Sequence, residues 1–405
     1  MKRLYLYINH HELVGTIYCD IVSNKEVFSF EYDSNFLRSK RAFEFDPSIF
    51  PYEGRQYSSD NEFGFIQDLI PDRFGKMLLD DRENKQAKKE NRLPKKLSTY
   101  DYLVAVNDLS RLGAFRLKED IDGEFVNSDK ELAIPPYIYL RDIEEASHSF
   151  EENGEFDKEV YQKLLLPGSS LGGARPKANV YYDDELWIAK FPSINDKYDV
   201  EAWELTMLDL ARECGINVSD FKYEKYSDRG ATLLTKRFDR DKNKRIHYAS
   251  FMTFLDAKDG ESGDYSYLDL VAIIKGKCND TDSLLNELYR RIIFTYLINN
   301  TDNHLRNHGL LLKDDRFWTL APMFDVNPTF YISSFGLSLI DNDTIYSKDT
   351  IVSIAKYFNI SKEKAIGIYS DIYSIIVNKI GSVSRQYGVK EKELNQLKMI
   401  IDSRK

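Results

Sequence analysis

The spacing of apolar residues changes once along this chain, and the change limits what the chain can fold into. Up to about residue 238, apolar residues mostly form short runs between polar turns, such as Leu4, Leu6 and Ile8, which predicts β-strands. Beyond that point they recur every three or four residues, most regularly over 284–298, which predicts helices. We therefore expect an α+β fold of two lobes with a cleft between them.

Three sub-domains are expected, because 405 residues exceed what one hydrophobic core usually holds. Residues 1–130 are predicted to be β-rich, with a helix over 63–83, and Pro135-Pro136 marks a boundary near residue 130. Residues 131–238 are predicted to form strands and one helix, and residues 239–405 a mainly helical lobe. The strands expected in the middle part are 178–182, 186–191 and a pair within 222–238; the expected helices are 200–214, 284–298, 361–384 and 390–401.

Charge and cysteine usage exclude some classes of protein. The formal net charge of −10 provides no overall field that would attract nucleic acid, so we expect no direct binding to it. The three cysteines, Cys19, Cys214 and Cys278, lie far apart and lack the spacing of a zinc site, which favours a reducing cytoplasm. No apolar run approaches the ~20 residues that span a bilayer, so we expect no membrane association.

The segment 299–308 directly follows the best-predicted helix, so it is expected to be a loop on a rigid support. Its Asp302 and Asn307 are five positions apart, which is the spacing of the base and the metal-binding Asn in protein-kinase catalytic loops. Asp325 follows an apolar run and precedes a turn, as the metal-binding Asp of kinases does. Each feature alone has an alternative, since Asp and Asn are common in loops and Asp325 could simply begin an Asn-Pro turn.

Upstream elements favour the kinase interpretation. Residues 167–177 form a Gly-rich segment whose N–H groups could approach phosphates, although it matches neither a Walker A loop nor G-x-G-x-x-G. Lys190 lies on a predicted strand, and the following helix bears Glu201 and Glu204, which is the order of the Lys–Glu pair that positions ATP. The ordered set indicates a nucleotide-dependent phosphotransferase more strongly than any single motif does.

A metal-dependent hydrolase is the rival interpretation of the loop. His304 and His308 are four apart and could bind a metal if the segment were helical, with Asp302 or Asp325 as a third ligand. The segment is not His-Glu-x-x-His and lacks a general-base Glu. We therefore expect His304 to orient the loop or its Asp.

Together these residues resemble the HipA-like kinases, the toxin components of bacterial toxin–antitoxin pairs. The resemblance covers nearly the whole chain and rests on six segments, which are 69–75 (Leu-Ile-Pro-Asp-Arg-Phe-Gly), 170–177, 190–192, 236–240, 300–307 and 320–325. It implies a protein-kinase-like fold with an extra N-terminal sub-domain that phosphorylates Ser or Thr with ATP and Mg²⁺. The short stretch between Lys190 and the next helix departs from better-known relatives and leaves an activation-loop-like element in question.

The resemblance also implies roles for single residues. Asp302 would be the catalytic base, and Asn307 and Asp325 the Mg²⁺ ligands. Lys190 would hold the α- and β-phosphates, paired with Glu204 rather than Glu201. The remaining nucleotide contacts would come from Ser170, Leu171, Gly172, Gly173, Ala174, Lys177, Lys236, Phe238 and His304, with 236–238 as the hinge that meets adenine.

Regulation and partners follow from the same resemblance. In the family, a Ser at the head of the Gly-rich loop is autophosphorylated, and Ser170 or its neighbour Ser169 occupies that place. The expected partners are a small DNA-binding antitoxin and a protein substrate, such as an aminoacyl-tRNA synthetase or another translation component. The alternative in this setting is a catalytically silent module that acts as a corepressor by binding an antitoxin.

Overall fold

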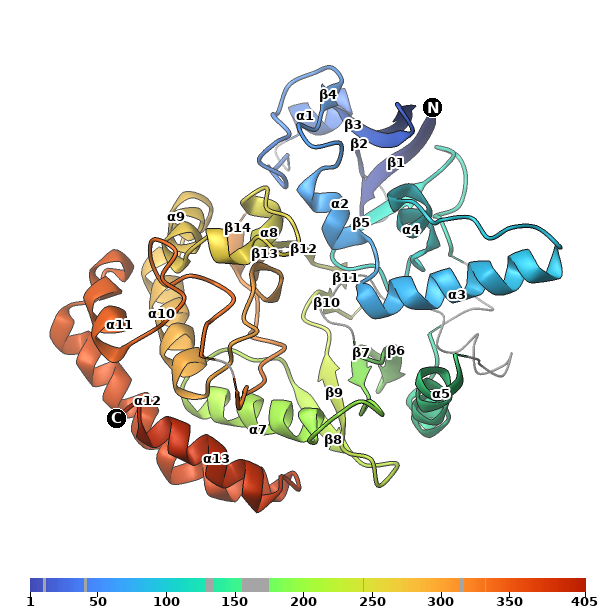
Figure 1. The fold of residues 1–405 in the computed structure, drawn as a ribbon. Coiled ribbons are helices and arrows are strands. Elements are labelled where there is room, and N and C mark those ends of the chain that lie inside the picture. Colours follow the sequence, from blue (N-terminus) through green and yellow to red (C-terminus); the bar gives the residue numbers. More distant parts are fainter. Residues whose placement is uncertain are drawn as a thin grey trace.

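The computed structural model describes residues 1–9, 12–39, 42–128, 134–154, 175–242, 244–313, 317–331 and 333–405. Within them the chain forms two larger antiparallel sheets, a three-stranded sheet, a two-stranded pair and a set of helices that are concentrated toward the C-terminus (Figure 1). The structure thus has the mixed α+β character that the apolar pattern predicts. The predicted boundary at residue 130 lies outside the described residues, so the three-part division remains a prediction.

The N-terminal part is built on a five-stranded sheet of order β4-β3-β2-β1-β5. Its strands are β1 (Lys2–Ile8), β2 (Glu12–Val22), β3 (Lys25–Tyr32), β4 (Gln56–Tyr57) and β5 (Phe115–Lys118). Alternate residues of β1 and β3 are buried, and several of them join an aromatic core that includes Phe30, Phe45, Phe65 and Phe115. This core gives the first part of the chain its own hydrophobic interior.

The helices of this part are α1 (Ser34–Arg38), α2 (Gly64–Leu69), α3 (Arg73–Lys89) and α4 (Thr99–Ala105). The single helix predicted over 63–83 is wrong, because α2 stops before Pro71 and α3 starts afresh after Asp72. The residue before a proline is disfavoured in the helical region, and the Asp72 carboxylate caps α3 by accepting a hydrogen bond from the N–H of Gly75. The break places Asp72 at the start of a new helix.

The middle part has a four-stranded antiparallel sheet of order β6-β7-β9-β8, flanked by two helices. Its strands are β6 (Lys177–Tyr182), β7 (Glu185–Lys190), β8 (Phe221–Glu224) and β9 (Thr232–Lys236). Helix α5 (Leu140–Asn153), which follows η1 (Tyr137–Tyr139), packs Leu140 and Ile143 against Val180 and Trp187 of this sheet. Helix α7 (Val200–Glu213) lies beside β9, and the predicted strands and helix of this region are confirmed.

The C-terminal part surrounds α10 (Thr281–Leu297), whose apolar residues are almost all buried. Its other helices are α8 (Phe251–Phe254), α9 (Tyr267–Lys277), α11 (Lys348–Ile354), α12 (Lys362–Gln386) and α13 (Glu391–Asp402), with short 3₁₀ turns η2 (Ser262–Asp264), η3 (Leu305–Asn307) and η4 (Ala355–Phe358). A small sheet of β12 (His247–Ser250), β13 (Gly309–Lys313) and β14 (Phe317–Leu320) interrupts this helical lobe. No helix in the described part of the chain is long and apolar enough to cross a membrane.

A buried charge network joins the N-terminal part to the segment that follows β9, where β10 (Arg240–Asp241) and β11 (Lys244–Arg245) form a two-residue pair. The Asp239 carboxylate accepts hydrogen bonds from Arg237, from Arg240 and from the N–H of Gly113, at 2.6 to 2.8 Å. Asp239 is fully buried. Because breaking such a network leaves charges without partners, it fixes the N-terminal part against the hinge region.

Candidate active site

One lysine lies at the centre of the site and joins elements from both lobes. Lys190 ends β7, and its ammonium lies 2.8 Å from both carboxylate oxygens of Glu204 on α7. The same ammonium lies 2.9 Å from Oδ1 of Asp325, in the segment that follows β14. Burial lowers the pKa of Lys190, but the Asp325 and Glu204 carboxylates outweigh it and raise the pKa overall. Lys190 is therefore a fixed cation that faces a carboxylate on the opposite side of the cleft.

The two glutamates on α7 have different partners. Glu201 lies one helical turn before Glu204, and its carboxylate pairs with the guanidinium of Arg175, at 2.8 and 2.9 Å. Arg175 also forms an ion pair with Asp196, in the stretch between β7 and α7. Arg175 lies near the end of the Gly-rich segment 167–177, so the Arg175–Glu201 contact ties the end of that segment to α7, while Glu204 pairs with Lys190.

Asp325 is held in an unusual backbone conformation. Its φ is 57°, in the left-handed region that only a few non-glycine residues adopt, and its N–H donates to Oε1 of Glu204 at 3.1 Å. Burial would raise the pKa of Asp325, but the ammonium groups of Lys190 and Lys177 outweigh burial and lower the pKa to about 2. The group is therefore an anion at neutral pH and directs its charge into the cleft.

The loop after α10 is anchored at its start. Thr329 donates its N–H to the carbonyl of Asn299 at 2.9 Å, and the side chain of Thr301 donates to that of Thr329 at 2.8 Å. Near the C-terminus, Arg404 donates to the side-chain oxygen of Asn299 at 2.6 Å. These contacts seat the loop on the segment that follows Asp325, which brings together two elements that are separated along the chain.

Within this loop, Asn307 and Asp302 are linked directly. The side-chain NH₂ of Asn307 donates to the main-chain carbonyl of Asp302 at 3.2 Å. Its Oδ1 is buried and has no hydrogen-bond partner among the described residues. A buried amide oxygen without a partner is costly, so this atom is placed to accept a ligand, such as a cation.

Asp302 itself is exposed at the surface of the cleft. Partial desolvation raises its pKa, His304 opposes that shift, and the Asp325 carboxylate adds to it. His304 also acts to lower the pKa of Asp325, so it lies within electrostatic reach of both carboxylates. A raised pKa makes Asp302 a stronger proton acceptor than an ordinary aspartate.

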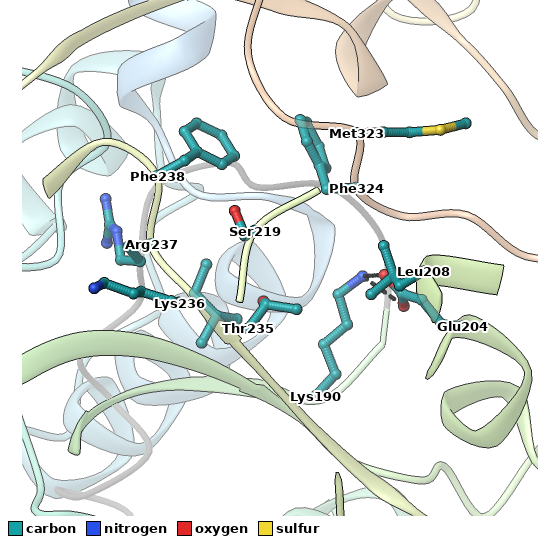
Figure 2. A pocket seen from close by; sticks show the side chains of 11 residues that line it. Lys190, Glu204, Leu208, Ser219, Thr235, Lys236, Arg237, Phe238, Met323 and Phe324 are labelled. Carbon is teal, nitrogen blue, oxygen red and sulfur yellow. Dashed lines mark hydrogen bonds and ion pairs between the residues drawn. The ribbon is translucent and has the colours of Figure 1, made fainter. Parts of the chain in front are cut away.

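A largely apolar cavity opens beside Lys190, shown in Figure 2. It is lined by Ile188, Lys190, Glu204, Leu208, Ser219, Thr235, Lys236, Arg237, Phe238, Met323 and Phe324. The ring of Phe238 lies 5.5 Å from those of Tyr248 and Phe324, which closes one side. Lys236 itself pairs with Glu185 at 2.6 Å, so its backbone rather than its ammonium is the part available to a bound ring. The apolar and aromatic lining suits a flat heteroaromatic group.

The predicted site residues therefore fall into two groups. The described ones, Lys177, Lys190, Glu204, Lys236, Phe238, Asp302, His304, Asn307 and Asp325, lie around the cavity and the cleft beside it. Ser169, Ser170, Leu171, Gly172, Gly173 and Ala174 lie outside the described residues.

The hydrolase interpretation gains no support from this geometry. His308 is buried against Tyr267, and burial lowers its pKa to about 3. Neither of its ring nitrogens has a hydrogen-bond partner in the described part of the chain. Among the described residues, no group of three or more His, Cys, Asp and Glu side chains is placed to hold a metal ion.

The sequence did not indicate one residue of this region, Asp72. Its Oδ2 lies 2.8 Å from the ammonium of Lys177, at the start of β6. Asp72 lies in the Leu-Ile-Pro-Asp-Arg-Phe-Gly segment of the N-terminal part. That segment contributes to the family resemblance, but its sequence does not predict a contact with the nucleotide site. No local pattern reports a contact between such distant segments.

This chain is similar in sequence to one protein family and to two curated proteins named as kinases. Residues 169–380, more than half of the chain, match the family model of the HipA-like C-terminal domain. A protein of Sinorhizobium fredii named "Putative kinase Y4dM" is 27% identical over 225 residues, which cover 50% of each chain. A "Putative kinase" of Haemophilus influenzae is 27% identical over 226 residues, which cover 49% of this chain and 64% of the relative. The matches thus span about half to two thirds of these curated relatives.

A solved structure shares the fold over almost the full length. It is that of the toxin–antitoxin system HipA and HipB of Shewanella oneidensis MR-1 in complex with its operator DNA. The TM-score is 0.69 at 18% identity, and the match covers 98% of this chain and 95% of that one. At this identity the likeness establishes the fold, which is the α+β kinase-like fold that the sequence predicted.

Proposed function

The chain belongs to the HipA-like C-terminal domain family, and from that premise we propose that it is an ATP- and Mg²⁺-dependent serine/threonine protein kinase of the HipA toxin type. The observation that carries the proposal is the junction of Lys190, Glu204 and Asp325 beside the apolar cavity, which Lys190 and Glu204 line. Phosphoryl transfer from a nucleotide requires a lysine ammonium that a helix glutamate holds in place, close to an ionised aspartate. Lys190, Glu204 and Asp325 provide these three groups.

The nucleotide would lie along the cavity with its adenine between Ile188, Leu208 and Phe324, close to the backbone of Lys236 and Phe238. Its phosphates would then extend toward Lys190, whose charge would neutralise the α- and β-phosphates. Glu204 holds the ammonium in place at two equal distances of 2.8 Å. Ser170 to Ala174 would cover the phosphates with main-chain N–H groups, a role that we propose from the family pattern.

The residues present also fit a magnesium ion. Asp325 supplies an ionised carboxylate, and Asn307 supplies a buried amide oxygen without a partner in the described chain. These are the hard oxygen ligands that Mg²⁺ prefers, with phosphates and waters as the others. When bound, Mg²⁺ would neutralise charge that develops on the transferred phosphoryl group.

Asp302 would act on the acceptor. Its raised pKa and exposure suit it to take the proton of a Ser or Thr hydroxyl as the hydroxyl oxygen bonds to the γ-phosphorus. The bond between that phosphorus and the β–γ bridging oxygen breaks, ADP leaves, and the proton remains on the Asp302 carboxyl. His304 lies within electrostatic reach and would steady the charge on Asp302.

Regulation and partners follow from the family and are proposed on that basis. Autophosphorylation of Ser170 or Ser169 would place a phosphate of charge about −1.5 to −2 where the ATP phosphates bind, which would inactivate the enzyme. The partners would be a small DNA-binding antitoxin and a cytoplasmic protein substrate. Translation components would be the first substrates to test. The second candidate, a silent corepressor module, would bind the antitoxin without transferring phosphate.

Incubation with γ-labelled ATP and Mg²⁺ followed by mass spectrometry of the protein tests the proposal. We expect label on Ser169 or Ser170, and no label in Asp302→Asn, whose exposed position allows it to fold. Asp341→Asn, at an exposed turn residue whose positive φ asparagine adopts equally well, is the matched control and should retain labelling. Absence of label with intact ATP binding would favour the corepressor, and absence of both would reject the kinase.

A further inference from the structure

Two lysines face each other across the first two strands of the middle sheet. In the antiparallel pair of β6 and β7, Lys177 lies directly opposite Lys190. Side chains that are opposite each other in such a pair project from the same face of the sheet. Like charges placed this way repel each other. The arrangement therefore needs an acidic partner for each lysine.

Each lysine has such a partner, and the two partners come from different parts of the chain. Lys190 is held by Glu204 of α7, as described above. Lys177 is held by Asp72, at 2.8 Å between Nζ and Oδ2, with only 12% and 6% of the two side chains exposed. A pair this well shielded from water is weakly screened and holds its geometry.

Lys177 and Lys190 project from the same face of the sheet, and the ammonium of Lys190 lies 2.9 Å from Oδ1 of Asp325. The charge of Lys177, like that of Lys190, acts to lower the pKa of Asp325. Lys177 is the last residue of the Gly-rich segment 167–177, two positions after Arg175, which anchors the segment to α7. Two cations thus border the place where the triphosphate would lie, one on each of two adjacent strands.

We propose that Asp72 is a positioning residue for nucleotide binding, which does for Lys177 what Glu204 does for Lys190. The N-terminal part of the chain thereby forms part of the triphosphate site through one carboxylate. This inference rests on the proposed kinase function, since it concerns the phosphates of the same nucleotide. It assigns to the segment Ile70 to Gly75 a role in the reaction, besides its role in folding.

The chemistry of Asp72 allows its charge to be tested apart from its structural role. Its Oδ1 caps α3 by accepting from the N–H of Gly75 at 2.8 Å, while its Oδ2 pairs with Lys177. Asparagine caps helices as well as aspartate does, so Asp72→Asn keeps the cap and removes the charge. Asp33→Asn is a matched control, because Asp33 caps α1 in the same part of the chain and accepts from the N–H groups of Asn35 and Phe36.

The experiment measures the Kd of MgATP by calorimetry, and the rate constant of autophosphorylation as a function of MgATP concentration, in five proteins. These are the wild type, Asp72→Asn, Lys177→Gln, the double variant and Asp33→Asn. We expect Asp72→Asn to weaken MgATP binding by about 5- to 20-fold, the range of one charge-assisted contact. The half-saturating MgATP concentration of autophosphorylation should change more than its maximal rate constant. The double variant, which leaves no unpaired charge, should bind no more weakly than Lys177→Gln, and Asp33→Asn should match the wild type.

The possible results separate the two proposals. If the wild type binds MgATP and transfers phosphate, unchanged or tighter MgATP binding in Asp72→Asn would overturn this inference alone. Tighter binding would show that the Asp72–Lys177 pair opposes nucleotide binding. Additive losses in the double variant would also overturn it, because Asp72 would then act by a route other than Lys177. A wild type that binds no nucleotide would overturn the inference together with the proposed function.

Discussion

Lys190 and Asp325 lie 2.9 Å apart, ammonium to carboxylate, although one ends a strand of the middle sheet and the other follows the small C-terminal sheet. The pair spans the cleft, and Glu204 holds the same ammonium from the side of α7. The position of the Lys190 charge thus depends on both lobes at once.

Replacing Lys190 with methionine tests this dependence. The change leaves the buried Glu204 and the Asp325 carboxylate without their cation, and loss of one member of a buried ion pair costs about 3–5 kcal/mol. We expect that loss in urea unfolding, and a fall in phosphoryl transfer of about 100-fold or more. Lys379→Met, which breaks an exposed pair with Glu213, should change stability by less than about 1 kcal/mol. Equal effects of the two variants would contradict the assignment.

Oδ1 of Asn307, which has no hydrogen-bond partner among the described residues, predicts a response of stability to Mg²⁺. If Oδ1 of Asn307 is a ligand, Mg²⁺ added with a non-hydrolysable ATP analogue should raise the Tm of the wild type, since a ligand that binds only the folded state stabilises it. Asn307→Ala removes that ligand and should lose most of the Mg²⁺-dependent part of the rise while it keeps the part due to the analogue alone. Scanning calorimetry with Mg²⁺ and with a chelator distinguishes the two parts. The same Mg²⁺ increment in both proteins would remove Asn307 from the metal site.

The buried network around Asp239 predicts a large cost of removing one charge. Asp239→Asn leaves the buried guanidinium of Arg237, and that of Arg240, without a carboxylate. We expect the free energy of unfolding to fall by about 3–5 kcal/mol. Asp241→Asn, two residues later at an exposed position, should change it by no more than about 0.5 kcal/mol. Chemical denaturation of both variants measures the difference, and a small effect of Asp239→Asn would show that backbone carbonyls suffice to hold the arginines.

His247 predicts how stability depends on pH. Its ring packs against Phe115 at 4.1 Å between centroids, and burial lowers its pKa from 6.5 to about 3. Between these values the unfolded chain binds a proton that the folded chain does not, so stability falls as pH falls, by about 1.4 kcal/mol per pH unit for each such group. His308 shifts in the same direction. His247→Phe should therefore weaken the loss of stability from pH 6.5 to pH 5 in urea titrations, and an unchanged slope would reject the shift.

Local patterns predicted the elements that support the site. The alternation of strands, the periodic apolar face of 284–298 and the five-residue spacing of Asp302 and Asn307 are all contained in short stretches of sequence. The helical pattern over 63–83 corresponds to two helices instead of one, because the apolar spacing continues across Pro71 while the helix does not.

Contacts between distant segments could not be read in the same way. Glu201 and Glu204 are three apart on one helix and both are buried, so periodicity cannot decide which one faces Lys190. The partnership of Asp72 with Lys177 depends on how an N-terminal helix start docks against a strand of another sheet. Such choices are made by tertiary packing, which no window of sequence contains.

The junction of Asp239 with Gly113 and two arginines bears on how this protein can be dissected. A truncation that begins at residue 131 would retain the cavity residues and the loop around Asp302, yet it would delete the N–H of Gly113 and the carbonyl oxygens of Ser110 and Arg111 that bind Arg237. It would also delete Asp108, the carboxylate partner of Arg245, and uncover several buried guanidinium groups at once. We expect such a fragment to be poorly soluble on its own, because the part of the chain from residue 131 onward is not an autonomous folding unit.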